Sequence, residues 1–333
     1  MKAFIVDRYG KADVVRAGEM PEPVLREDDV LVQVHAASVN PLDVKIREGT
    51  FKLVVPYRLP FILGHDLAGI VVRVGSRVQQ FKSGDEIYAR TDSGRPGAFA
   101  EFISINENSA ANKPRALSME EAASIPLVGL TAWQALIERA NLRKGQKILI
   151  HAGSGGVGTF AIQLAKHLGA TVATTTSTAN VELVRRLGAD IVIDYRKDNF
   201  ETILHDYDVA FDTLGGETLE KSVRVLKLGG KLIGIAGPPD PDFAKGINAN
   251  LIVRLVTGLL SYGIRKAAKR HGISYSFLFM RPSGDQLREI AALIDSGIIR
   301  PVVDRIFPFE STKEALAYVE TGRAKGKVVV KVR

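Results

Sequence analysis

The stretch HAGSGGVG, from His151 to Gly158, is the part of the sequence that decides the fold. It follows the apolar run 147–150 and precedes the segment 159–168, which reads as a helix. Glycines at G-x-G-x-x-G spacing between a strand and a helix allow a tight turn, the approach of a pyrophosphate to the backbone, and close packing of helix on strand. The pattern predicts a dinucleotide-binding turn, with a glycine turn that binds no ligand as the alternative. The residues expected to contact the cofactor are Gly153, Ser154, Gly155, Gly156, Val157 and Gly158.

Strand-like and helix-like segments alternate from about residue 118 onward. This alternation predicts an α/β fold with a doubly wound parallel sheet. The first 120 residues instead contain short strand-like segments separated by turns, as in a compact β-rich domain. The valine-rich end, 327–332, would lack strand partners in the doubly wound part, so we expect it to fold back onto the first domain. The expected domains are a discontinuous β-rich domain, 1–122 with 300–333, and a nucleotide-binding domain, 123–299.

The second predicted strand, 171–175, carries the signal for cofactor choice. An acidic residue at its end would bind the ribose hydroxyls of NAD. Here no carboxylate occurs before Glu182, so the sequence favours NADP(H). The alternative is an ordinary polar loop with weak selectivity. The side chains expected around the extra phosphate are Thr176, Ser177, Asn180 and Tyr195, with Arg196 beside them.

The composition limits the possible chemistry. The chain of 333 residues contains no cysteine, which excludes thiolate catalysis and zinc sites built on sulfur. Its net charge of +8 would suit a nucleic acid or an anionic cofactor, and the basic run 265–270 reads best as a solvated helix face. The apolar run 251–260 is too short to span a bilayer and reads as a partly buried helix or a subunit contact. We see no signal peptide and expect a cytoplasmic protein without a membrane partner.

Several stretches together resemble the medium-chain dehydrogenases/reductases, in particular the zinc-independent quinone oxidoreductase and enone reductase branch. The resemblance covers essentially the whole chain. It implies a GroES-like catalytic domain, an inserted Rossmann domain, an active-site cleft between them, and a homodimer. The carrying stretches are 37–49 (ASVNPLDVKIREG), 63–69 (LGHDLAG), Gly84-Asp85, 129–133 (GLTAW), the glycine turn, 187–190 (LGAD) and 322–327 (GRAKGK).

The zinc-dependent members of this superfamily hold their metal with a cysteine near the position of Asn40 and with the histidine of a Gly-His-Glu motif. This sequence keeps Gly64 and His65 but has Asp66 in place of the glutamate. A lone histidine does not complete a tetrahedral site. We therefore expect no metal and a structural, hydrogen-bonding His65.

Without a metal, another group must stabilise an oxygen that becomes anionic during hydride transfer. The resemblance points to Lys45, where quinone reductases usually have a tyrosine and enone-reducing members a lysine. The alternative is a lysine that touches only a cofactor phosphate or solvent. Asn40 would position the substrate or nicotinamide, and Asp43 would orient Lys45 or, more in keeping with its place, cap the next helix.

The remaining contacts implied by the resemblance lie at the nicotinamide end of the cofactor. For Phe277 and Phe279 the alternative is plain core packing, and for Lys327 a surface lysine at a strand end. These expected contacts are Thr131, Leu214, Ala236, Gly237, Phe277, Phe279 and Lys327.

The sequence therefore predicts a zinc-independent, NADPH-dependent reductase that delivers hydride to a quinone or an α,β-unsaturated carbonyl. One alternative is an NADP-dependent alcohol or aldehyde oxidoreductase of the same superfamily. Another is a non-catalytic protein that binds a cofactor, RNA or a protein partner, for which only the basic run gives support. We expect the substrate contacts to come from the variable segments 51–63 and 248–262.

Overall fold

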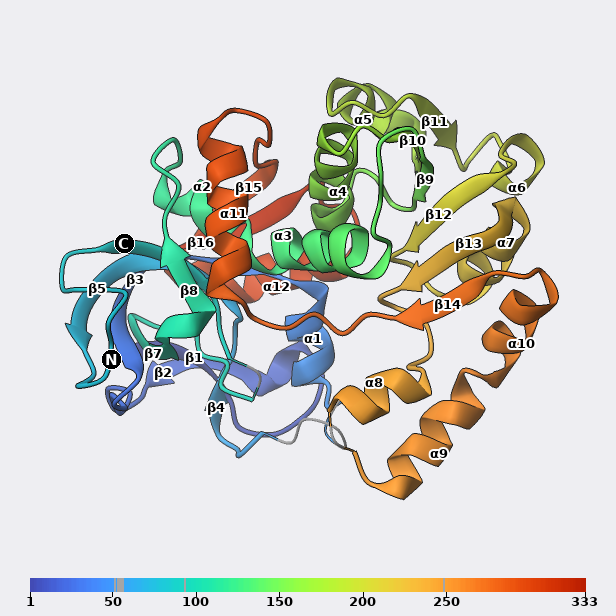
Figure 1. Cartoon of the computed structure of the whole chain (residues 1–333). Helices are drawn as coiled ribbons and strands as arrows, with labels where there is room; N and C mark the ends of the chain where they lie inside the picture. The colour runs from blue at the N-terminus through green and yellow to red at the C-terminus, as the bar shows by residue number, and fades with distance from the viewer. Residues whose placement is uncertain (51, 53–56, 93, 248) are drawn as a thin grey trace. The chain divides into compact units, whose positions relative to one another are not determined.

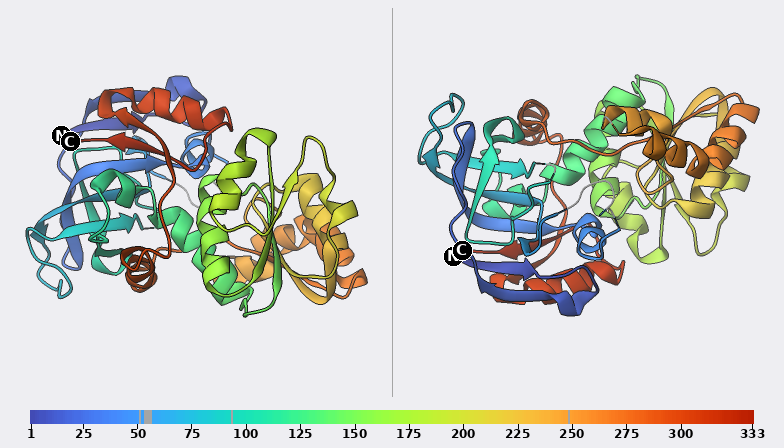
Figure 2. Two further views of the ribbon diagram at one scale, coloured as in Figure 1. Left: turned by 90° about the horizontal axis from the view of Figure 1, so that it is seen from above. Right: turned by 90° about the horizontal axis from the view of Figure 1, so that it is seen from below.

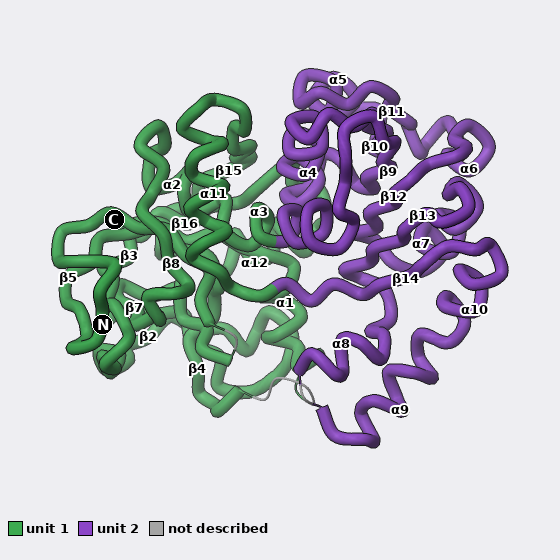
Figure 3. The backbone as a smooth tube through the Cα atoms, in the orientation of Figure 1, with its two compact units in different colours: residues 1–130, 281–333 green, residues 131–280 purple. Residues whose placement is uncertain are grey.

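The computed structural model describes residues 1–50, 52, 57–92, 94–247 and 249–333, which form two compact units (Figures 1 and 3). Unit 1 comprises Met1–Leu130 and Arg281–Arg333, and unit 2 comprises Thr131–Met280. The expected ranges were 1–122 with 300–333 and 123–299. Segments 123–130 and 281–299 thus lie in unit 1 and not with the nucleotide-binding part.

Helix α11 (Gly284–Asp295) explains most of that difference. It packs on the strand β8 (Ala110–Asn112) of unit 1. The buried Tyr88 donates a hydrogen bond of 2.5 Å to the carbonyl of Leu287, and Asp295 accepts one of 3.1 Å from the N–H of Ala116. The helical pattern of this segment was visible in the sequence, but its partner was not.

Unit 2 contains a six-stranded parallel sheet in the order β11-β10-β9-β12-β13-β14. This is the doubly wound order, with the switch point between β9 and β12, and it confirms the predicted fold class. The strands are β9 (Lys147–Ile150), β10 (Thr171–Thr176), β11 (Ile191–Asp194), β12 (Tyr207–Asp212), β13 (Leu226–Gly234) and β14 (Ser274–Phe277).

Helices of unit 2 cover both faces of this sheet (Figure 2). Strands such as β9, with the sequence KILI, are apolar because both of their faces are covered. The helices are α4 (Gly156–His167), α5 (Val181–Arg186), α6 (Phe200–Ile203), α7 (Gly216–Val225), α8 (Pro241–Gly246), α9 (Leu251–Leu260) and α10 (Tyr262–Arg270). Helix α3 (Pro126–Trp133) crosses the boundary of the units and continues as a π-helix over Gln134–Arg139.

Unit 1 contains a seven-stranded sheet and a three-stranded sheet. In the larger sheet six strands follow the order β15-β16-β3-β5-β6-β8, and the seventh, β7, pairs with β3. The smaller sheet has the order β2-β1-β4. Its helices are α1 (Pro41–Arg47), α2 (Met119–Ala123), α11 and α12 (Thr312–Glu320). Its other strands are β1 (Lys2–Val6), β2 (Val15–Glu19), β3 (Asp29–Val39), β4 (Phe61–Ile62), β5 (Asp66–Val74), β6 (Glu86–Arg90), β7 (Phe102–Asn106), β15 (Val303–Pro308) and β16 (Lys327–Lys331).

The terminal strand β16 pairs antiparallel with β3, with Val328 opposite Val39. This pairing agrees with the expected return of the valine-rich end to the first part of the chain. It places residue 327 next to the end of β3, where α1 begins.

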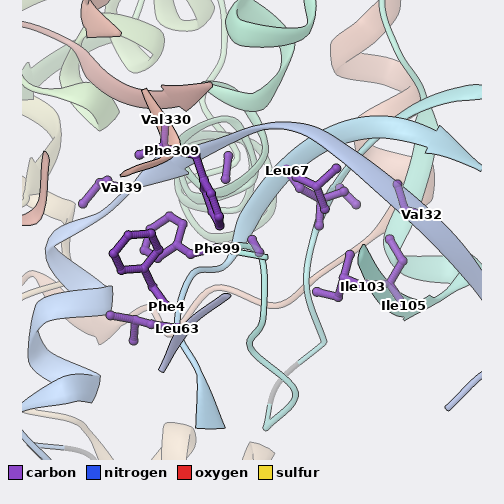
Figure 4. Close-up of a cluster of buried hydrophobic side chains, with 14 of the residues drawn as sticks. Phe4, Val32, Val39, Leu63, Leu67, Phe99, Ile103, Ile105, Phe309 and Val330 are labelled. Carbon is purple, nitrogen blue, oxygen red and sulfur yellow. The ribbon is translucent and has the colours of Figure 1, made fainter. Parts of the chain in front are cut away.

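The core of unit 1 joins residues from both ends of the chain (Figure 4). Phe4 of β1 and Phe309 meet edge to face, with ring centroids 5.2 Å apart and an interplanar angle of 87°. Around them lie side chains of β3, β5 and β16 that are almost completely buried. This core fixes the end of β3, and with it the start of α1.

Candidate functional site

The glycine turn joins β9 to α4 inside unit 2. Gly155 caps the helix with φ −80° and ψ 170°, and the helix begins at Gly156. No side chain caps this helix, and its first turn carries no acidic residue. The first N–H groups of a helix have no acceptor within the helix, so they are available to a phosphate, which the helix dipole also favours.

The three glycines of the motif have different surroundings. An added Cβ would lie 2.1 Å from Thr174 Oγ1 at Gly153, and 2.3 Å from the carbonyl oxygen of Ala152 at Gly158. At Gly155 it would meet only that same carbonyl oxygen, at 3.3 Å, among the described residues. The outer glycines therefore close the turn, and Gly155 leaves its surface open. The third glycine packs against the turn itself and not, as expected, against the strand.

Four polar side chains meet beside this turn, and we call them the hydroxyl cluster: Ser154, Thr176, Ser177 and Asn180. Ser154 Oγ accepts hydrogen bonds from Thr176 Oγ1 at 3.0 Å and from Asn180 Nδ2 at 3.1 Å. Asn180 Nδ2 also donates to Ser177 Oγ at 3.2 Å. Asn180 Oδ1 is buried without a hydrogen-bond partner among the described residues. The structure thus brings together four residues that the sequence placed around the adenosine end of the cofactor.

A carboxylate also lies beside this cluster, on the neighbouring strand. Asp194, at the end of β11, is in register with Thr176. Its oxygens accept from Thr178 Oγ1 at 2.6 Å and from the N–H of Arg196 at 3.1 Å, and the bond from Thr178 lowers the pKa of Asp194. From the sequence we expected Tyr195 and Arg196, after the third strand, to lie near the phosphate, but not the preceding Asp194.

Tyr195 follows Asp194 and points outward. Its N–H donates to the carbonyl of Thr176 at 3.1 Å, but its side chain is exposed and makes no hydrogen bond with the described residues. Tyr195 is therefore near the hydroxyl cluster through its backbone, and its role as a cofactor contact stays a prediction.

His151, the first residue of the turn, is a structural residue. Its Nδ1 lies 3.1 Å from Thr175 Oγ1 and its Nε2 2.9 Å from Ser222 Oγ. Burial lowers the pKa of His151 to about 3, so the ring is neutral at physiological pH. The side chain ties the end of β9 to β10 and α7.

The loops after β12 and β13 lie against each other. A Cβ at Gly215 would lie 2.6 Å from the carbonyl oxygen of Ala236, and one at Gly237 would lie 2.7 Å from the hydroxyl of Tyr275. The buried Asp212 accepts from the N–H groups of Leu214, at 3.0 Å, and Gly215, at 2.5 Å, and burial raises its pKa. Leu214, Ala236 and Gly237 are thus held in one place, as expected for residues beside one ligand.

The other residues expected near the nicotinamide are packed into unit 2. Phe277 and Phe279 both contact Phe243 of α8, with centroids 5.3 and 5.5 Å apart, and Phe277 is buried. Thr131 is buried within α3. These surroundings agree with the core-packing alternative for Phe277, and cofactor contact stays a prediction for all three residues.

In unit 1, Lys327, Asn40 and Asp66 form a buried polar cluster. The ammonium group of Lys327 donates to Asn40 Oδ1, to Asp66 Oδ2 at 3.3 Å and to the carbonyl of Val39 at 3.3 Å. Asn40 Nδ2 donates to Asp66 Oδ2 at 2.9 Å, and Ser38 Oγ donates to it at 3.0 Å. Burial lowers the pKa of Lys327, against the attraction of Asp66. Lys327 is thus neither a surface lysine nor free to move.

Asp43 and His65 extend this cluster. Asp43 Oδ2 accepts from the N–H of Asn40 at 2.8 Å, which caps α1, and Asp43 Oδ1 lies 2.5 Å from His65 Nδ1. His65 Nε2 is buried without a partner among the described residues. The buried Arg90, in register with Asp66, brings a second positive charge, and burial lowers its pKa. Two carboxylates and two cations therefore share this interior.

Lys45 lies apart from these groups. It is exposed on the last turn of α1, and its ammonium makes no hydrogen bond or ion pair with the described residues. Asp43, two positions earlier, faces the interior. The structure thus unites Asn40, Asp43 and Lys327 but not Lys45, whose catalytic role stays a prediction. Residues 51, 53–56 and 248 of the expected substrate segments lie outside the described residues.

The residues of this cluster do not fit a zinc ion. The described part of the chain holds no group of three or more His, Cys, Asp or Glu side chains placed to bind a metal. The side-chain oxygen of Asn40 already accepts a hydrogen bond from the ammonium group of Lys327, and Nδ1 of His65 lies against Asp43. No chemical step below uses a metal.

The sequence argument did not include Asp66 or Arg90 among the site residues. Both are charged residues at the ends of apolar strand segments, and that is the signal that points to a buried polar site. Their partners come from other strands, so the pattern alone does not pair them.

Comparison with known proteins agrees with this architecture. Residues 26–115 match the family described as alcohol dehydrogenase GroES-like domain, and residues 187–330 match the family described as zinc-binding dehydrogenase. The chain is 36% identical to the mitochondrial NAD(P)H oxidoreductase RTN4IP1 of Danio rerio, covering 100% of this chain and 91% of the relative.

Two further similarities cover nearly the whole chain. The chain is 38% identical to the chloroplastic NADPH-dependent alkenal/one oxidoreductase of Arabidopsis thaliana, over 99% of this chain and 79% of that protein. The solved quinone oxidoreductase from Coxiella burnetii superposes with a TM-score of 0.87 at 31% identity, covering 100% and 99% of the two chains. With its doubly wound unit, its glycine turn and these full-length relatives, the chain belongs to the medium-chain dehydrogenase/reductase superfamily.

Proposed function

We propose that this chain is a zinc-independent oxidoreductase that uses NADPH to reduce a quinone or an α,β-unsaturated carbonyl compound. The observation that carries the proposal is the open surface of Gly155 at the start of α4, next to the hydroxyl cluster. The relatives described above are an NAD(P)H oxidoreductase, an NADPH-dependent alkenal/one oxidoreductase and a quinone oxidoreductase, and they support the same reaction class.

The residues of unit 2 fit NADPH. The N–H groups at the start of α4 would hold the pyrophosphate, since Gly155 leaves room for it. The hydroxyls and amide of the hydroxyl cluster would bind the adenosine ribose and its 2′-phosphate. The oxygens of Asp194 already accept hydrogen bonds from Thr178 Oγ1 and from the N–H of Arg196, and the carboxylate stays ionised because the bond from Thr178 lowers its pKa. When bound, NADPH supplies the hydride that reduces the acceptor.

The residues of unit 1 would supply the polar groups of the reaction. When the acceptor is reduced, a carbon atom of the conjugated carbonyl compound or of the quinone ring gains the hydride, and an oxygen gains a proton. A proton donor must therefore be near that oxygen. Lys45 is exposed and makes no hydrogen bond or ion pair with the described residues, and we propose that it gives this proton, directly or through water. Asn40, held by Lys327 and Asp66, would orient the acceptor or the nicotinamide, and Asp43 would fix Asn40 through its N–H.

These roles divide the chain into a cofactor-binding unit 2 and a catalytic unit 1, which we propose as its functional domains. We also propose a homodimer, on family resemblance. We further propose a cytoplasmic location, in contrast to the two relatives named above, which are mitochondrial and chloroplastic proteins. No helix among the described residues is long and apolar enough to cross a membrane.

The proposal is tested by measuring NADPH oxidation by the purified chain with a panel of quinones, enones, alkenals and saturated aldehydes. We expect turnover with quinones or conjugated carbonyls and little with saturated aldehydes. Turnover confined to saturated aldehydes or alcohols would instead favour an alcohol or aldehyde oxidoreductase. NADPH binding without turnover of any of these compounds would contradict the proposal.

A further inference from the structure

Helix α9 of unit 2 turns its apolar side to the solvent. Leu251, Leu255 and Leu259 are exposed to 81%, 65% and 69%, while Thr257 and Ser261 are buried. The two hydroxyls are satisfied within the helix, by the carbonyls of Arg254 and Thr257 at 3.0 and 2.7 Å. A surface helix of a globular protein normally has the opposite orientation, with its apolar side buried. The sequence predicted either a partly buried helix or a subunit contact here; the exposure of the leucines disagrees with the first, and the second stays a prediction.

The exposed apolar residues lie on one side of the helix. They recur with the spacing i, i+1, i+4, i+5, i+8 and i+9, which covers about half of a helical surface. We call them the apolar face of α9: Leu251, Ile252, Leu255, Val256, Leu259 and Leu260. An exposed, continuous face of this kind marks an interaction site.

The charged residues of the segment that carries this face are all basic. Between Asp242 and Asp285 there is no acidic residue, although the chain contains 37 of them. The basic residues of this interval are Lys245, Arg254, Arg265, Lys266, Lys269, Arg270 and Arg281. Lys266, Lys269 and Arg270 are exposed on α10 and form no ion pair with the described residues; Lys266 lies 5.4 Å from the ring centroid of the exposed Tyr262.

We propose that α9 and α10 dock this chain onto an anionic lipid surface. The apolar face would enter the boundary between headgroups and acyl chains, and the cations of α10 would bind lipid phosphates and carboxylates. Tyr262, the first residue of α10, is a residue type that suits the headgroup region. This proposal concerns a peripheral contact and does not depend on the proposed reaction.

Other occupants of this face fit the charge pattern less well. Helix α9 has ten residues and is about 15 Å long, half of a bilayer core, so it does not span. In a symmetric pair of chains joined through this face, the cations of one copy would approach those of the other. A nucleic acid would pair with the cations but leave the apolar face exposed to water. The sequence argument against a membrane partner rested on helix length, which does not bear on a peripheral contact.

Co-sedimentation of the full chain with lipid vesicles tests the proposal. We expect binding to vesicles of phosphatidylcholine mixed with phosphatidylserine, weak binding to phosphatidylcholine alone, and weaker binding as salt is added. Leu251→Ser with Leu259→Ser should lower the affinity for the anionic vesicles roughly tenfold or more. Lys269→Ala with Arg270→Ala should do the same, at about fivefold per charge.

Matched controls separate the surface from general effects. Val24→Ser removes an apolar side chain that is 82% exposed in unit 1, and Arg185→Ala with Arg186→Ala removes two adjacent cations from the end of α5. Both should bind vesicles like the wild type. Leu255→Trp keeps the face apolar, and its fluorescence should shift to shorter wavelength only with anionic vesicles.

Three results would overturn the proposal. The first is the absence of binding to the anionic vesicles. The second is binding that the α9 and α10 variants and their controls share equally. The third is a wild-type dimer that becomes a monomer in Leu251→Ser with Leu259→Ser, measured by light scattering, because the face would then join two copies of the chain.

Discussion

Lys327 and Asp66 are 261 residues apart in the sequence, yet Nζ of the lysine lies 3.3 Å from Oδ2 of the aspartate, and both side chains are buried. Removal of one charge from a buried pair leaves the other uncompensated in a medium that solvates it poorly. Ser38, Asn40 and the N–H of Leu127 would still donate to Asp66, and Arg90 would be left as the one cation of the pair of cations described for this cluster.

Lys327→Met should therefore lower the free energy of unfolding by about 3–5 kcal/mol. Lys327→Met with Asp66→Asn should recover part of this loss, because it also removes the carboxylate that had lost its ammonium partner. Lys331→Met, on the same strand, breaks only the half-exposed pair with Glu120 and should cost less than about 1 kcal/mol. Denaturant unfolding of the four proteins checks the expectation, which fails if Lys327→Met and Lys331→Met are equally stable.

The glycine turn allows a stability effect to be separated from a binding effect. Gly158→Ala should destabilise the chain by about 1–3 kcal/mol, since its Cβ overlaps the carbonyl of Ala152. Gly155→Ala should change stability by less than about 1 kcal/mol, because its Cβ has only one neighbour at 3.3 Å. The same methyl would occupy the proposed pyrophosphate space, so the Kd for NADPH should rise roughly tenfold or more. Thermal unfolding and cofactor titration measure the two effects; unchanged NADPH affinity in Gly155→Ala would place the cofactor elsewhere.

Ser177→Asp should select against NADPH. The new carboxylate would lie in the hydroxyl cluster, where we place the 2′-phosphate, and like charges in contact cost several kcal/mol, or roughly a tenfold or greater rise in KM. NADH lacks that phosphate and should be affected much less. Ser76→Asp, at an exposed serine of unit 1, is the matched control. An equal rise of KM for NADH and NADPH would show that the 2′-phosphate does not bind at the hydroxyl cluster.

Lys45→Ala tests the proton donor. If the exposed ammonium acts in the transition state, kcat should fall by roughly 10²-fold while KM changes little. Lys11→Ala, at another exposed lysine of unit 1, controls for the change in net charge. A kcat equal to that of the wild type would leave Lys45 with a role in binding or with none.

Lowering the pH should reduce the stability of unit 2, because Asp190 becomes protonated. Burial alone would raise the pKa of Asp190, but bonds from Lys166 Nζ and from the N–H of Val172 lower it below its ordinary value. The folded state therefore binds fewer protons than the unfolded state near the ordinary pKa of about 3.9. The stabilisation is present above that value and is lost as the pH falls through the folded pKa.

Asp190→Asn should accordingly lose stability at neutral pH and show a smaller further loss between pH 5 and pH 2 than the wild type, in urea unfolding at each pH. Asp198→Asn, at an exposed carboxylate of the same unit, serves as the reference. Parallel pH curves for the wild type and Asp190→Asn would show that this ion pair is not linked to folding.

The parts of the fold that local pattern determines were predictable from the sequence. The glycine turn, its strand and its helix are adjacent in the chain, and apolar periodicity set the order of the elements in unit 2. The hydroxyl cluster followed from the same logic, because the ends of adjacent parallel strands meet at one edge of the sheet. Asp194 was missed, although Tyr195 and Arg196 beside it were named, because the search for an acidic residue covered only the end of the second strand.

The polar cluster of unit 1 was not predictable in the same way. Asn40, Asp66 and Lys327 meet only because the register between β3, β5 and β16 brings them together, and no local pattern fixes a register across hundreds of residues. A lysine before three valines looked like a strand-end surface residue. Likewise, the place of α11 in unit 1 depends on packing against β8 and Tyr88, which periodicity does not reveal.

The pairing of β16 with β3 also sets an order of events during synthesis on the ribosome. Unit 2 is one continuous stretch of chain, and the strand that supplies Lys327 to unit 1 is translated after the whole of that stretch. Until then, Asp66 has no lysine beside it, and β3 lacks its partner along one edge from Ala36 to Val39. The nascent chain must therefore carry an incomplete first unit while the second is made, and in that interval the free strand edge is exposed to mispairing or to a chaperone.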